Sequence, residues 1–137
     1  LIKMHSMPIN PNDRYIVTGF FNFGAEGEYK GIGFEGAGVV IEVGEEVDPN
    51  LIGKKVAQIG NPFTPSYQGS WRQYLYCEAE DIAVYPDEAD LDKMSSTFIN
   101  PFATLAMLDF VFKKKAKWIV QDAACSTLGK MVCKAAK

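Results

Sequence analysis

The sequence predicts a mainly β domain that continues into helices and the beginning of an α/β domain. Up to about residue 85, short segments rich in β-branched and aromatic residues alternate with turn-forming residues, which is typical of strands. From residue 90 the apolar residues recur at helical spacing. An apolar segment at 118–121, a small-residue turn and a further helical pattern then form one strand–turn–helix unit.

The composition argues against two classes of partner. The 137 residues carry 14 basic and 17 acidic side chains, a formal net charge of -3, without a basic cluster that alternates with aromatic residues. No apolar run approaches the ~20 residues that a membrane span needs. We therefore expect neither nucleic acid nor a membrane as a partner.

The three cysteines lack the spacing of a metal site, and their odd number favours a reduced compartment over a disulfide framework. Cys77, Cys125 and Cys133 are interpreted as small buried hydrophobic residues. No signal or transit peptide precedes Met4, and Leu1 need not be the true start. We predict a cytoplasmic location, with a mitochondrial one as the alternative.

The first element is predicted to be a strand over residues 1–7, because apolar and polar side chains alternate there. The central element is expected at residues 31–44, where four glycines surround Glu35 ahead of a β-branched run. Such glycines indicate backbone that bends sharply or approaches another group closely. We therefore expect this strand to lie inside the sheet.

A helix of about two turns is predicted between these two strands. Asn10 suits its N-cap, Pro11 its first position, Asp13 its third position and Gly19 its end. Asn10 is therefore expected at the N-terminal edge of this helix.

Further strands are predicted at 54–59, 69–77 and 82–85, with a turn at 48–50 and loops at 20–30 and 60–65. The aromatic rings of the first loop are expected to pack inward. One helix is predicted over 91–98 and a second over 102–112, separated at the Asn100–Pro101 pair because proline interrupts helices. Leu105, Leu108 and Phe112 would share a face of the second helix. Residues 118–121 are interpreted as a short buried strand, and 128–137 as a helix.

Six motifs occur in order along nearly the whole chain: residues 9–13 (INPND), 33–38 (GFEGAG), 53–56 (GKKV), 69–71 (GSW), 100–101 (NP) and 123–129 (AACSTLG). In this order and spacing the chain resembles the zinc-independent branch of the medium-chain dehydrogenase/reductase superfamily, which includes quinone oxidoreductases and enoyl reductases. The resemblance implies a GroES-like, partly open β-barrel over residues 1–99, truncated at its N-terminus. Residues 100–137 would be a linking helix and the first βα unit of an incomplete Rossmann domain.

The resemblance also bears on metal binding. In the zinc-dependent branch a Cys falls at the position of Asn10 and a His at that of Phe34, and neither residue found here is a plausible zinc ligand. We expect no metal.

Asn10 and Tyr15 are the candidate catalytic residues, because related quinone oxidoreductases use an Asn and a Tyr at these helix positions. An amide can bond the carboxamide of nicotinamide or a substrate carbonyl, and a phenol can donate to developing enolate charge. The structural alternative is that Asn10 only caps its helix and Tyr15 only packs. Glu35 is interpreted as an acceptor for backbone N–H groups of the glycine turn.

Enoyl reductases of this branch carry a tyrosine after the short helix, thought to be the proton donor. Residues 19–22 here contain no hydroxyl group, and a phenyl ring cannot act as a general acid. His5 is interpreted as a structural imidazole, and Trp71 as part of the core or the cleft lining.

The residues expected to bind the cofactor lie in the last third of the chain: Asn100, Thr104, Ala124, Ser126, Thr127, Leu128 and Gly129. Thr104 resembles a threonine that approaches nicotinamide, but it lies one residue later, about 100° around a helix. The small residues of the turn would bring backbone N–H groups to a pyrophosphate.

The resemblance implies a metal-free oxidoreductase that uses NADPH to reduce a quinone, an α,β-unsaturated carbonyl compound or an enoyl thioester. Its partner would be a small-molecule substrate, and the full-length protein would be a homodimer. The chain alone is expected to be inactive, because most of the nucleotide-binding domain is missing. The alternative function is a non-catalytic GroES-like interaction or structural module with a decayed nucleotide site.

Overall fold

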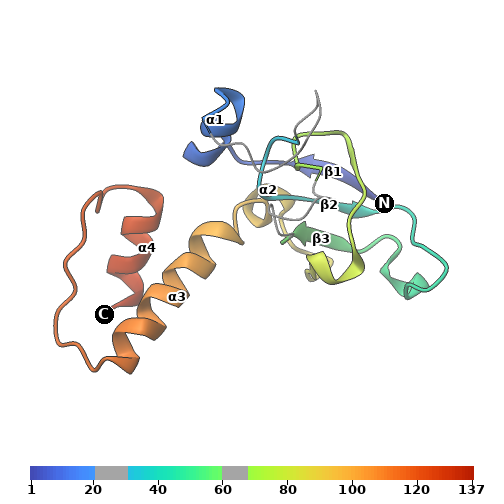
Figure 1. Cartoon of the computed structure of the whole chain (residues 1–137). Helices are drawn as coiled ribbons and strands as arrows, with labels where there is room; N and C mark the ends of the chain where they lie inside the picture. The colour runs from blue at the N-terminus through green and yellow to red at the C-terminus, as the bar shows by residue number, and fades with distance from the viewer. Residues whose placement is uncertain (21–30, 60–67) are drawn as a thin grey trace. The chain divides into compact units, whose positions relative to one another are not determined.

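The computed structural model describes residues 1–20, 31–59 and 68–137 (Figure 1). Its strands form one antiparallel sheet with the order β4-β1-β2-β3-β5. The strands are β1 (Ile2–Ser6), β2 (Gly36–Val40), β3 (Lys55–Gln58), β4 (Tyr74–Leu75) and β5 (Ile82–Val84). Every predicted strand before residue 86 is therefore confirmed, although β4 is much shorter than expected.

The central position of β2 confirms the expectation drawn from its glycines. β2 pairs with β1 on one side and with β3 on the other, so that Gly38 lies opposite Met4 and Val56. A Cβ atom at Gly38 would overlap the carbonyl oxygen of Lys3 in β1. Glycine is thus required here by the close approach of the neighbouring strand.

The hydrophobic core lies on one face of this sheet. Ile2, Val40, Val56 and Leu75 are each almost fully buried and come from four different strands. In β1 the alternation is as predicted, because Lys3 is exposed while Ile2 is buried.

The first helix, α1 (Pro11–Val17), has the predicted cap residues. Asn10 is the N-cap, and its backbone N–H donates to the Asp13 carboxylate over 2.6 Å. Gly19 ends the helix region with a φ of +72°, a conformation that glycine adopts without strain. A single turn, α2 (Leu91–Met94), and two short 3₁₀ turns, η1 (Pro49–Leu51) and η2 (Ala79–Asp81), complete this part of the chain.

Contacts divide the chain into two units, Leu1–Ser96 and Thr97–Lys137. The second unit consists of α3 (Ile99–Lys113) packed against α4 (Thr127–Ala135). Thr104 and Leu108 of α3 are buried, as is Val132 of α4. None of the described helices is both long and apolar enough to cross a membrane.

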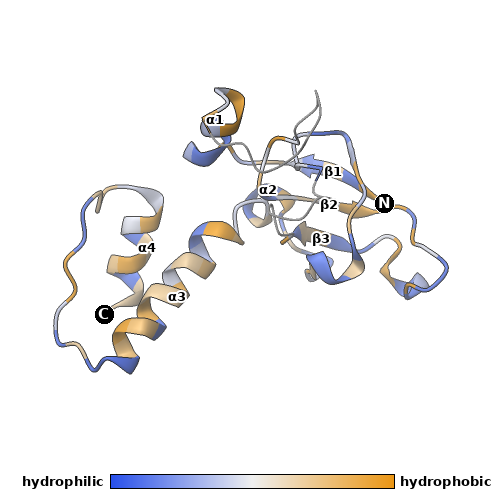
Figure 2. Ribbon diagram, in the orientation of Figure 1, coloured by the Kyte–Doolittle hydropathy of each residue, from blue (hydrophilic) through white to orange (hydrophobic). Residues whose placement is uncertain are grey.

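The predicted start of α3 after the Asn100–Pro101 pair is wrong. The helix runs through Asn100 and Pro101, because Pro101 occupies its first turn, where N–H groups have no partner within the helix. Leu105, Leu108 and Phe112 share a face of this helix as predicted, because they follow one another at i, i+3 and i+7. Of the three only Leu108 is buried, whereas Leu105 and Phe112 are 62% and 67% exposed. α4 packs against α3, and Figure 2 shows apolar residues along much of α3.

The predicted buried strand at 118–121 is also wrong. These residues have no regular secondary structure, and Trp118 and Val120 are 88% and 96% exposed. A strand is stabilised by pairing, and no strand of the described residues pairs with this segment. The predicted helix that follows is present as α4.

The loop predictions are tested only at their margins. Phe20 is 73% exposed, so its ring does not pack inward as expected. The other residues of that loop, 21–30, and those of the predicted loop at 60–65 lie outside the described residues. The turn at 48–50 is confirmed, because the Asp48 side chain accepts the backbone N–H of Asn50 at the start of η1.

Candidate functional site

A cluster of buried polar side chains lies where α1 begins. The amide nitrogen of Asn10 donates to Oε1 of Glu35 over 3.0 Å, across 25 residues of sequence. Glu35 and Asp13 are 1% and 0% exposed, while Asn10 is only partly buried. The folded chain thus brings the predicted catalytic residue Asn10 onto a buried carboxylate of the glycine turn.

Asp13 is the second acid of this cluster. Burial raises the pKa of its carboxyl, and the nearby Glu35 carboxylate raises this pKa further, whereas N–H groups of Asn10 and Gly33 that bond it lower the pKa. Among the described residues, its Oδ1 atom has no hydrogen-bond partner, and neither has the buried hydroxyl of Ser70. Unsatisfied buried oxygens are rare and costly, so this cluster carries unused hydrogen-bonding capacity.

Backbone contacts hold the glycine turn in place. Gly33 has a φ of +91°, and a Cβ atom there would overlap the Ser70 hydroxyl and the Trp71 ring. The N–H of Ser70 donates to the carbonyl oxygen of Gly33, and the N–H of Trp71 to that of Ile32. Residues 31–35 and 69–71 therefore form one close-packed support for the cluster.

Trp71 also holds the segment before α1. Its indole N–H donates to the carbonyl oxygen of Pro8 over 3.3 Å, two residues before Asn10. Trp71 further lines an open groove on the surface. The other residues of this groove are Met4, His5, Met7, Ile9, Arg72 and Gln73. The interpretation of Trp71 as a cleft-lining residue agrees with this groove.

Tyr15 does not join the cluster. It follows Asn10 by five residues, which places it about 140° away around the helix. Its side chain is 42% exposed and its ring lies 5.4 Å from that of Phe20. The catalytic roles predicted for Asn10 and Tyr15 stay predictions.

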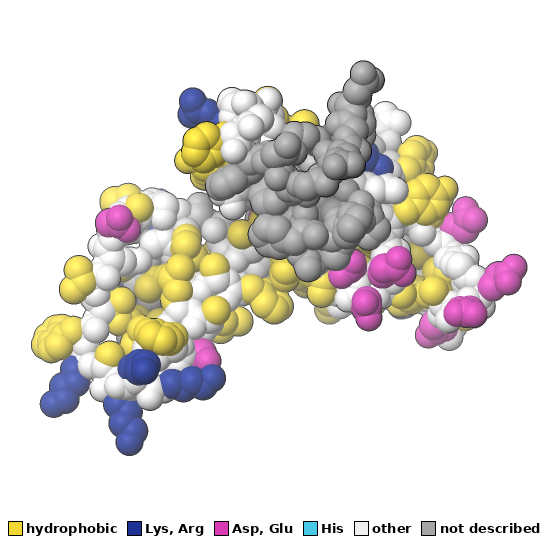
Figure 3. Space-filling model, viewed as in Figure 1, with side chains coloured by type: hydrophobic (Ala, Val, Ile, Leu, Met, Phe, Trp, Pro, Cys, Tyr) yellow, Lys and Arg dark blue, Asp and Glu magenta, His cyan; other side chains and the backbone are white. Residues whose placement is uncertain are grey.

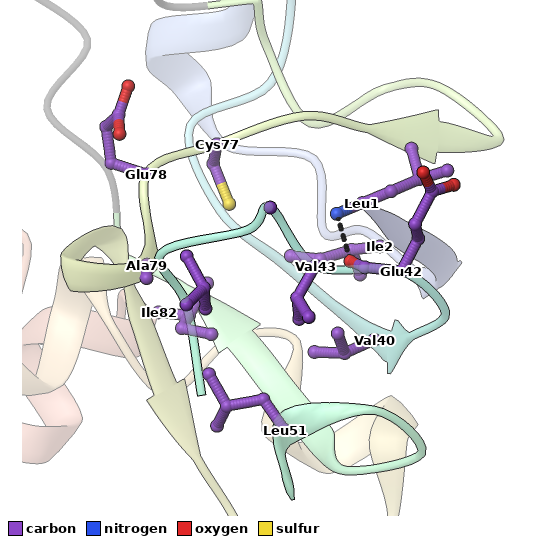
Figure 4. A pocket seen from close by; sticks show the side chains of 12 residues that line it. Leu1, Ile2, Val40, Glu42, Val43, Leu51, Cys77, Glu78, Ala79 and Ile82 are labelled. Carbon is purple, nitrogen blue, oxygen red and sulfur yellow. Dashed lines mark hydrogen bonds between the residues drawn. The ribbon is translucent and has the colours of Figure 1, made fainter. Parts of the chain in front are cut away.

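A second hollow lies at the edge of the hydrophobic core (Figure 4). Ile2, Val40, Val43 and Leu51 contribute apolar walls, and the Cys77 thiol points toward them. Burial raises the pKa of the Cys77 thiol to about 11. A thiol with such a pKa is protonated at neutral pH and is a poor nucleophile.

The turn before α4 is the predicted pyrophosphate-binding segment. The Ser126 hydroxyl caps α4 by accepting the Gly129 N–H over 3.0 Å. A Cβ atom at Gly129 would lie 2.6 Å from the carbonyl oxygen of Ala123, so only glycine permits this close turn. The N–H groups of Thr127 and Leu128 remain at the positive end of α4.

This turn fits a phosphate group in its backbone geometry. Two first-turn N–H groups and the helix dipole favour an anion at this position. Ala124 is exposed beside them. Gln121 supports the turn, because its side-chain nitrogen donates to the Gly129 carbonyl oxygen over 3.1 Å.

Asn100 and Thr104 lie one turn apart on α3. The Thr104 hydroxyl donates to the backbone carbonyl oxygen of Asn100 over 2.9 Å, and Thr104 is 4% exposed. This arrangement satisfies the hydroxyl within the helix. The roles predicted for Asn100 and Thr104 in cofactor binding stay predictions.

The described residues contain no group of three or more His, Cys, Asp or Glu side chains arranged for a metal ion. At the position of the metal-ligating histidine, Phe34 contributes a buried phenyl ring, which has no donor atom. His5 lies in β1 with Nε2 3.5 Å from the Asp92 carboxylate of α2. It is thus exposed and paired rather than part of the cluster.

The cysteines correct a prediction. Cys125 and Cys133 are exposed, and only Cys77 is partly buried. Both exposed thiols lie in or beside α4, where few other elements are present to cover them. Sequence reasoning also missed that Asp13 and Ser70 belong to the polar cluster. The available signal was the spacing of Asn10 and Asp13, three residues apart at a helix start.

Comparisons with known proteins agree with this geometry. Residues 1–87 match the model of the alcohol dehydrogenase GroES-like domain. The chain is 32% identical over 139 residues to a mitochondrial enoyl-[acyl-carrier-protein] reductase of Dictyostelium discoideum, covering 100% of the chain and 38% of that relative. It is 27% identical over 138 residues to a quinone oxidoreductase of Sus scrofa, covering 100% of the chain and 40% of that relative.

A solved structure gives the same result. A Mesorhizobium loti protein provisionally described as an NADPH:quinone reductase matches with a TM-score of 0.83 and 31% identity, over 99% of the chain and 39% of that protein. The chain thus spans about two-fifths of the length of these relatives. The mainly antiparallel sheet with a few helices confirms the predicted fold class. This chain therefore belongs to the alcohol dehydrogenase GroES-like domain family, within the medium-chain dehydrogenase/reductase superfamily of oxidoreductases.

Proposed function

We propose that this chain forms the substrate side of an NADPH-dependent reductase that transfers hydride to a quinone, an α,β-unsaturated carbonyl compound or an enoyl thioester. The observation that carries the proposal is the Asn10 amide, which is partly exposed and held by the buried Glu35 carboxylate. The names of the relatives support the same reaction class, because they describe quinone and enoyl reductases.

Asn10 suits the nicotinamide end of such a site. Its amide is fixed at a helix start, where it can bond a carbonyl group of cofactor or substrate without losing side-chain freedom on binding. The neighbouring groove has apolar walls from Met4, Met7, Ile9 and Trp71. Walls of this kind suit the ring of a quinone or the chain of an enone or acyl group.

The turn before α4 would hold part of the cofactor. The N–H groups of Thr127 and Leu128 would bind a phosphate, and Gly129 would allow the close approach. When bound, the dihydronicotinamide supplies the hydride. Proton delivery to the reduced product falls to water or to the Tyr15 phenol, since residues 19–22 contain no hydroxyl group.

The proposed enzyme would need no metal, act on a small-molecule substrate and form a homodimer. The 137-residue chain alone is expected to show no turnover. The alternative locations, cytoplasm and mitochondrion, both remain compatible with the relatives, of which the enoyl reductases are mitochondrial.

The test uses the full-length product of the gene that encodes this chain. NADPH oxidation is followed by absorbance with a quinone, an enone and an enoyl thioester in turn. We expect oxidation with at least one acceptor, and a loss of about tenfold in kcat/KM for Asn10→Ala, the worth of one hydrogen bond. The absence of oxidation with all three acceptors would refute the proposal.

Asn50→Ala is a matched control for Asn10→Ala. The Asn50 amide nitrogen also donates to a carboxylate, that of Asp48, over 2.9 Å, but this pair is exposed in η1. We expect its kcat/KM to equal that of the wild type. An equal loss in both variants would show that the effect does not come from the Asn10 site.

A second candidate function is a non-catalytic interaction module. Thr104 favours it, because its hydroxyl is buried and bonded within α3. The separation of Tyr15 from Asn10 points the same way. Titration of the full-length protein with NADPH, followed by tryptophan fluorescence, separates the two functions. Saturable quenching supports the reductase, and a flat response supports the module.

A further inference from the structure

We infer that Glu35 is a positioning residue: it holds the Asn10 amide so that Asn10 presents an N–H donor, which binds a carbonyl oxygen of the ligand. This inference rests on the proposed function, because the ligand is the nicotinamide carboxamide or a carbonyl substrate. It specifies which part of the Asn10 amide contacts the ligand, a point on which the sequence is silent.

The first step concerns which end of the amide faces Glu35. The contact of 3.0 Å joins the amide nitrogen of Asn10 to Oε1 of Glu35. A carboxylate oxygen accepts hydrogen bonds, and so does an amide oxygen, so only the nitrogen end can face it favourably. The reversed amide would place two acceptor oxygens against each other in a buried site.

The second step concerns what remains of the amide. Asn10 and Asp13 stand at the two positions of a capping box: the Asp13 carboxylate accepts the Asn10 backbone N–H over 2.6 Å, and the Asp13 N–H donates to the Asn10 backbone carbonyl oxygen over 3.0 Å. The Asn10 side chain is therefore not needed for the cap and is held by Glu35 instead. The amide nitrogen carries two hydrogens, and one of them is directed to Glu35. The second N–H is the donor that the proposal assigns to the ligand.

The third step concerns rigidity. The backbone of Asn10 is tied to the Asp13 carboxylate over 2.6 Å, and Pro8 is tied to the Trp71 indole over 3.3 Å. Glu35 itself is 1% exposed and cannot move away without leaving a buried gap. A donor supported in this way keeps its direction before the ligand arrives, which lowers the entropy cost of binding.

A consequence for ligand choice follows. A ligand group that contains a carbonyl oxygen but no N–H should satisfy Asn10 as well as a carboxamide does. The opposite polarity, in which Asn10 accepts from the carboxamide NH₂, would require that NH₂ group. NADPH and its 3-acetylpyridine analogue differ in this respect, because the analogue replaces the NH₂ by a methyl group and keeps the carbonyl oxygen.

The binding test measures the dissociation constants of both reduced nucleotides for the full-length gene product. We expect the two constants to agree within about threefold, and Asn10→Ala to weaken both by about tenfold. Glu35→Leu should weaken both in the same way, whereas Glu35→Gln keeps an acceptor oxygen and should retain most of the affinity. A wild-type protein that binds the analogue about tenfold more weakly, with the difference lost in Asn10→Ala, would overturn the assigned polarity.

A second measurement needs no ligand. In nitrogen-15 correlated spectra of the 137-residue chain, the Asn10 side-chain proton bonded to Glu35 should resonate downfield and exchange slowly with water. Glu35→Leu should abolish both properties, and Glu35→Gln should preserve the slow exchange. Asp48→Ala is the matched control, because it should move the Asn50 amide signals and leave those of Asn10 unchanged.

The two measurements separate the possible failures. If Glu35→Leu leaves the chemical shift and exchange rate of the Asn10 side-chain proton unchanged, the positioning role is refuted, whatever the two dissociation constants are. Asn10 signals that respond, in a protein that binds neither nucleotide, would refute the proposed function and with it the ligand role of Asn10. If Glu35→Leu unfolds the chain, Glu35→Gln is used in its place. The proposal then requires that the Asn10 side-chain proton still exchanges slowly with water and that most of the affinity for both nucleotides is retained.

Discussion

The start of α1 and the start of α4 both have a local cap, but the cap residue of α1 also bonds a distant segment of the chain. Asn10 bonds Glu35 across 25 residues, whereas Ser126 bonds Gly129 across three. The acids of the first cluster are almost fully buried, and Ser126 is exposed. Both local caps, Asn10 with Asp13 and Ser126 with Gly129, are available to a helix alone, whereas the bond from Asn10 to Glu35 exists only in the folded unit.

The two units also differ in how much of their apolar surface is buried. In Leu1–Ser96 the sheet buries its central strand on both sides, and Gly38 has no room for a side chain. In Thr97–Lys137 several large apolar side chains of α3 are exposed, and apolar and basic groups share the visible surface of this unit (Figure 3). Tertiary packing therefore contributes more to the stability of the first unit, and local helix signals more to that of the second.

The largest expected effect tests the packed sheet. Gly38→Ala places a Cβ atom on the carbonyl oxygen of Lys3 and should lower the free energy of unfolding by about 3 kcal/mol, as overpacking does. Urea unfolding followed by circular dichroism measures it. At Gly44 a Cβ atom meets nothing within 4 Å, so Gly44→Ala is the control and should change little. Equal results for both variants would mean that β2 is not packed as described.

The next effect tests Asp13, which joins the local cap residue Asn10 to the distant Gly33. Asp13→Ala removes the acceptor of two backbone N–H groups, those of Asn10 and Gly33, and should cost about 2 kcal/mol. Urea unfolding again gives the measurement. A cost below about 0.5 kcal/mol would show that these N–H groups find other partners. The start of α1 would then depend on distant segments no more than the start of α4 does.

The pH dependence of the free energy of unfolding gives a second test of Asp13, with Asp13→Asn as the comparison. Burial raises the pKa of Asp13 in the folded chain above its ordinary value of 3.8, so the folded form binds a proton more readily than the unfolded form. The stabilisation from this site is therefore fully present below the ordinary value and is lost as pH rises through the folded-state value. The free energy of unfolding of the wild type, relative to Asp13→Asn, should be larger near about pH 4 than near pH 7. The reverse slope would contradict the assignment.

A smaller effect tests the local cap. Ser126→Ala removes the acceptor of the Gly129 N–H and should cost about 1 kcal/mol, confined to α4. Hydrogen exchange should become faster in Thr127–Ala135 and stay unchanged in the strands. Faster exchange in β2 as well would show that the two units are coupled more strongly than their contacts indicate.

The smallest expected change in stability comes from removing an exposed ion pair, and the larger changes can be compared with it. Lys113 and Asp109 form an exposed ion pair of 2.7 Å, one helical turn apart on α3. Lys113→Ala should cost no more than about 0.5 kcal/mol, because water and salt screen exposed pairs. Thermal unfolding at low and high salt measures it, and a cost above about 1 kcal/mol would be unexpected.

The features that were predicted correctly depend on local patterns. The caps of α1, the turn at 48–50 and the strands β1, β2, β3 and β5 follow from short sequence signals. The errors concern elements whose state depends on neighbours: residues 118–121 have the composition of a buried strand but are exposed, and α3 continues through Pro101. Strand pairing and the position of a proline within a helix are not visible in a short window of sequence.

The candidate site shows the same division. Asn10 and Glu35 were both noticed in the sequence, yet their hydrogen bond could not be predicted, because 25 residues separate them. The catalytic role predicted for Tyr15 stays a prediction. The contribution of Asp13 as a buried acid could not be predicted either, since burial is a property of the packed chain.

The order of the strands and helices, the helix caps and the family motifs are determined by the sequence itself, because each depends on residues that are close together along the chain. Only the tertiary structure decided that Glu35 lies beneath Asn10, that Gly38 meets the backbone of β1, and that α3 is covered on one side. These contacts join distant segments, and their geometry is set by the packing of the whole unit rather than by any local pattern.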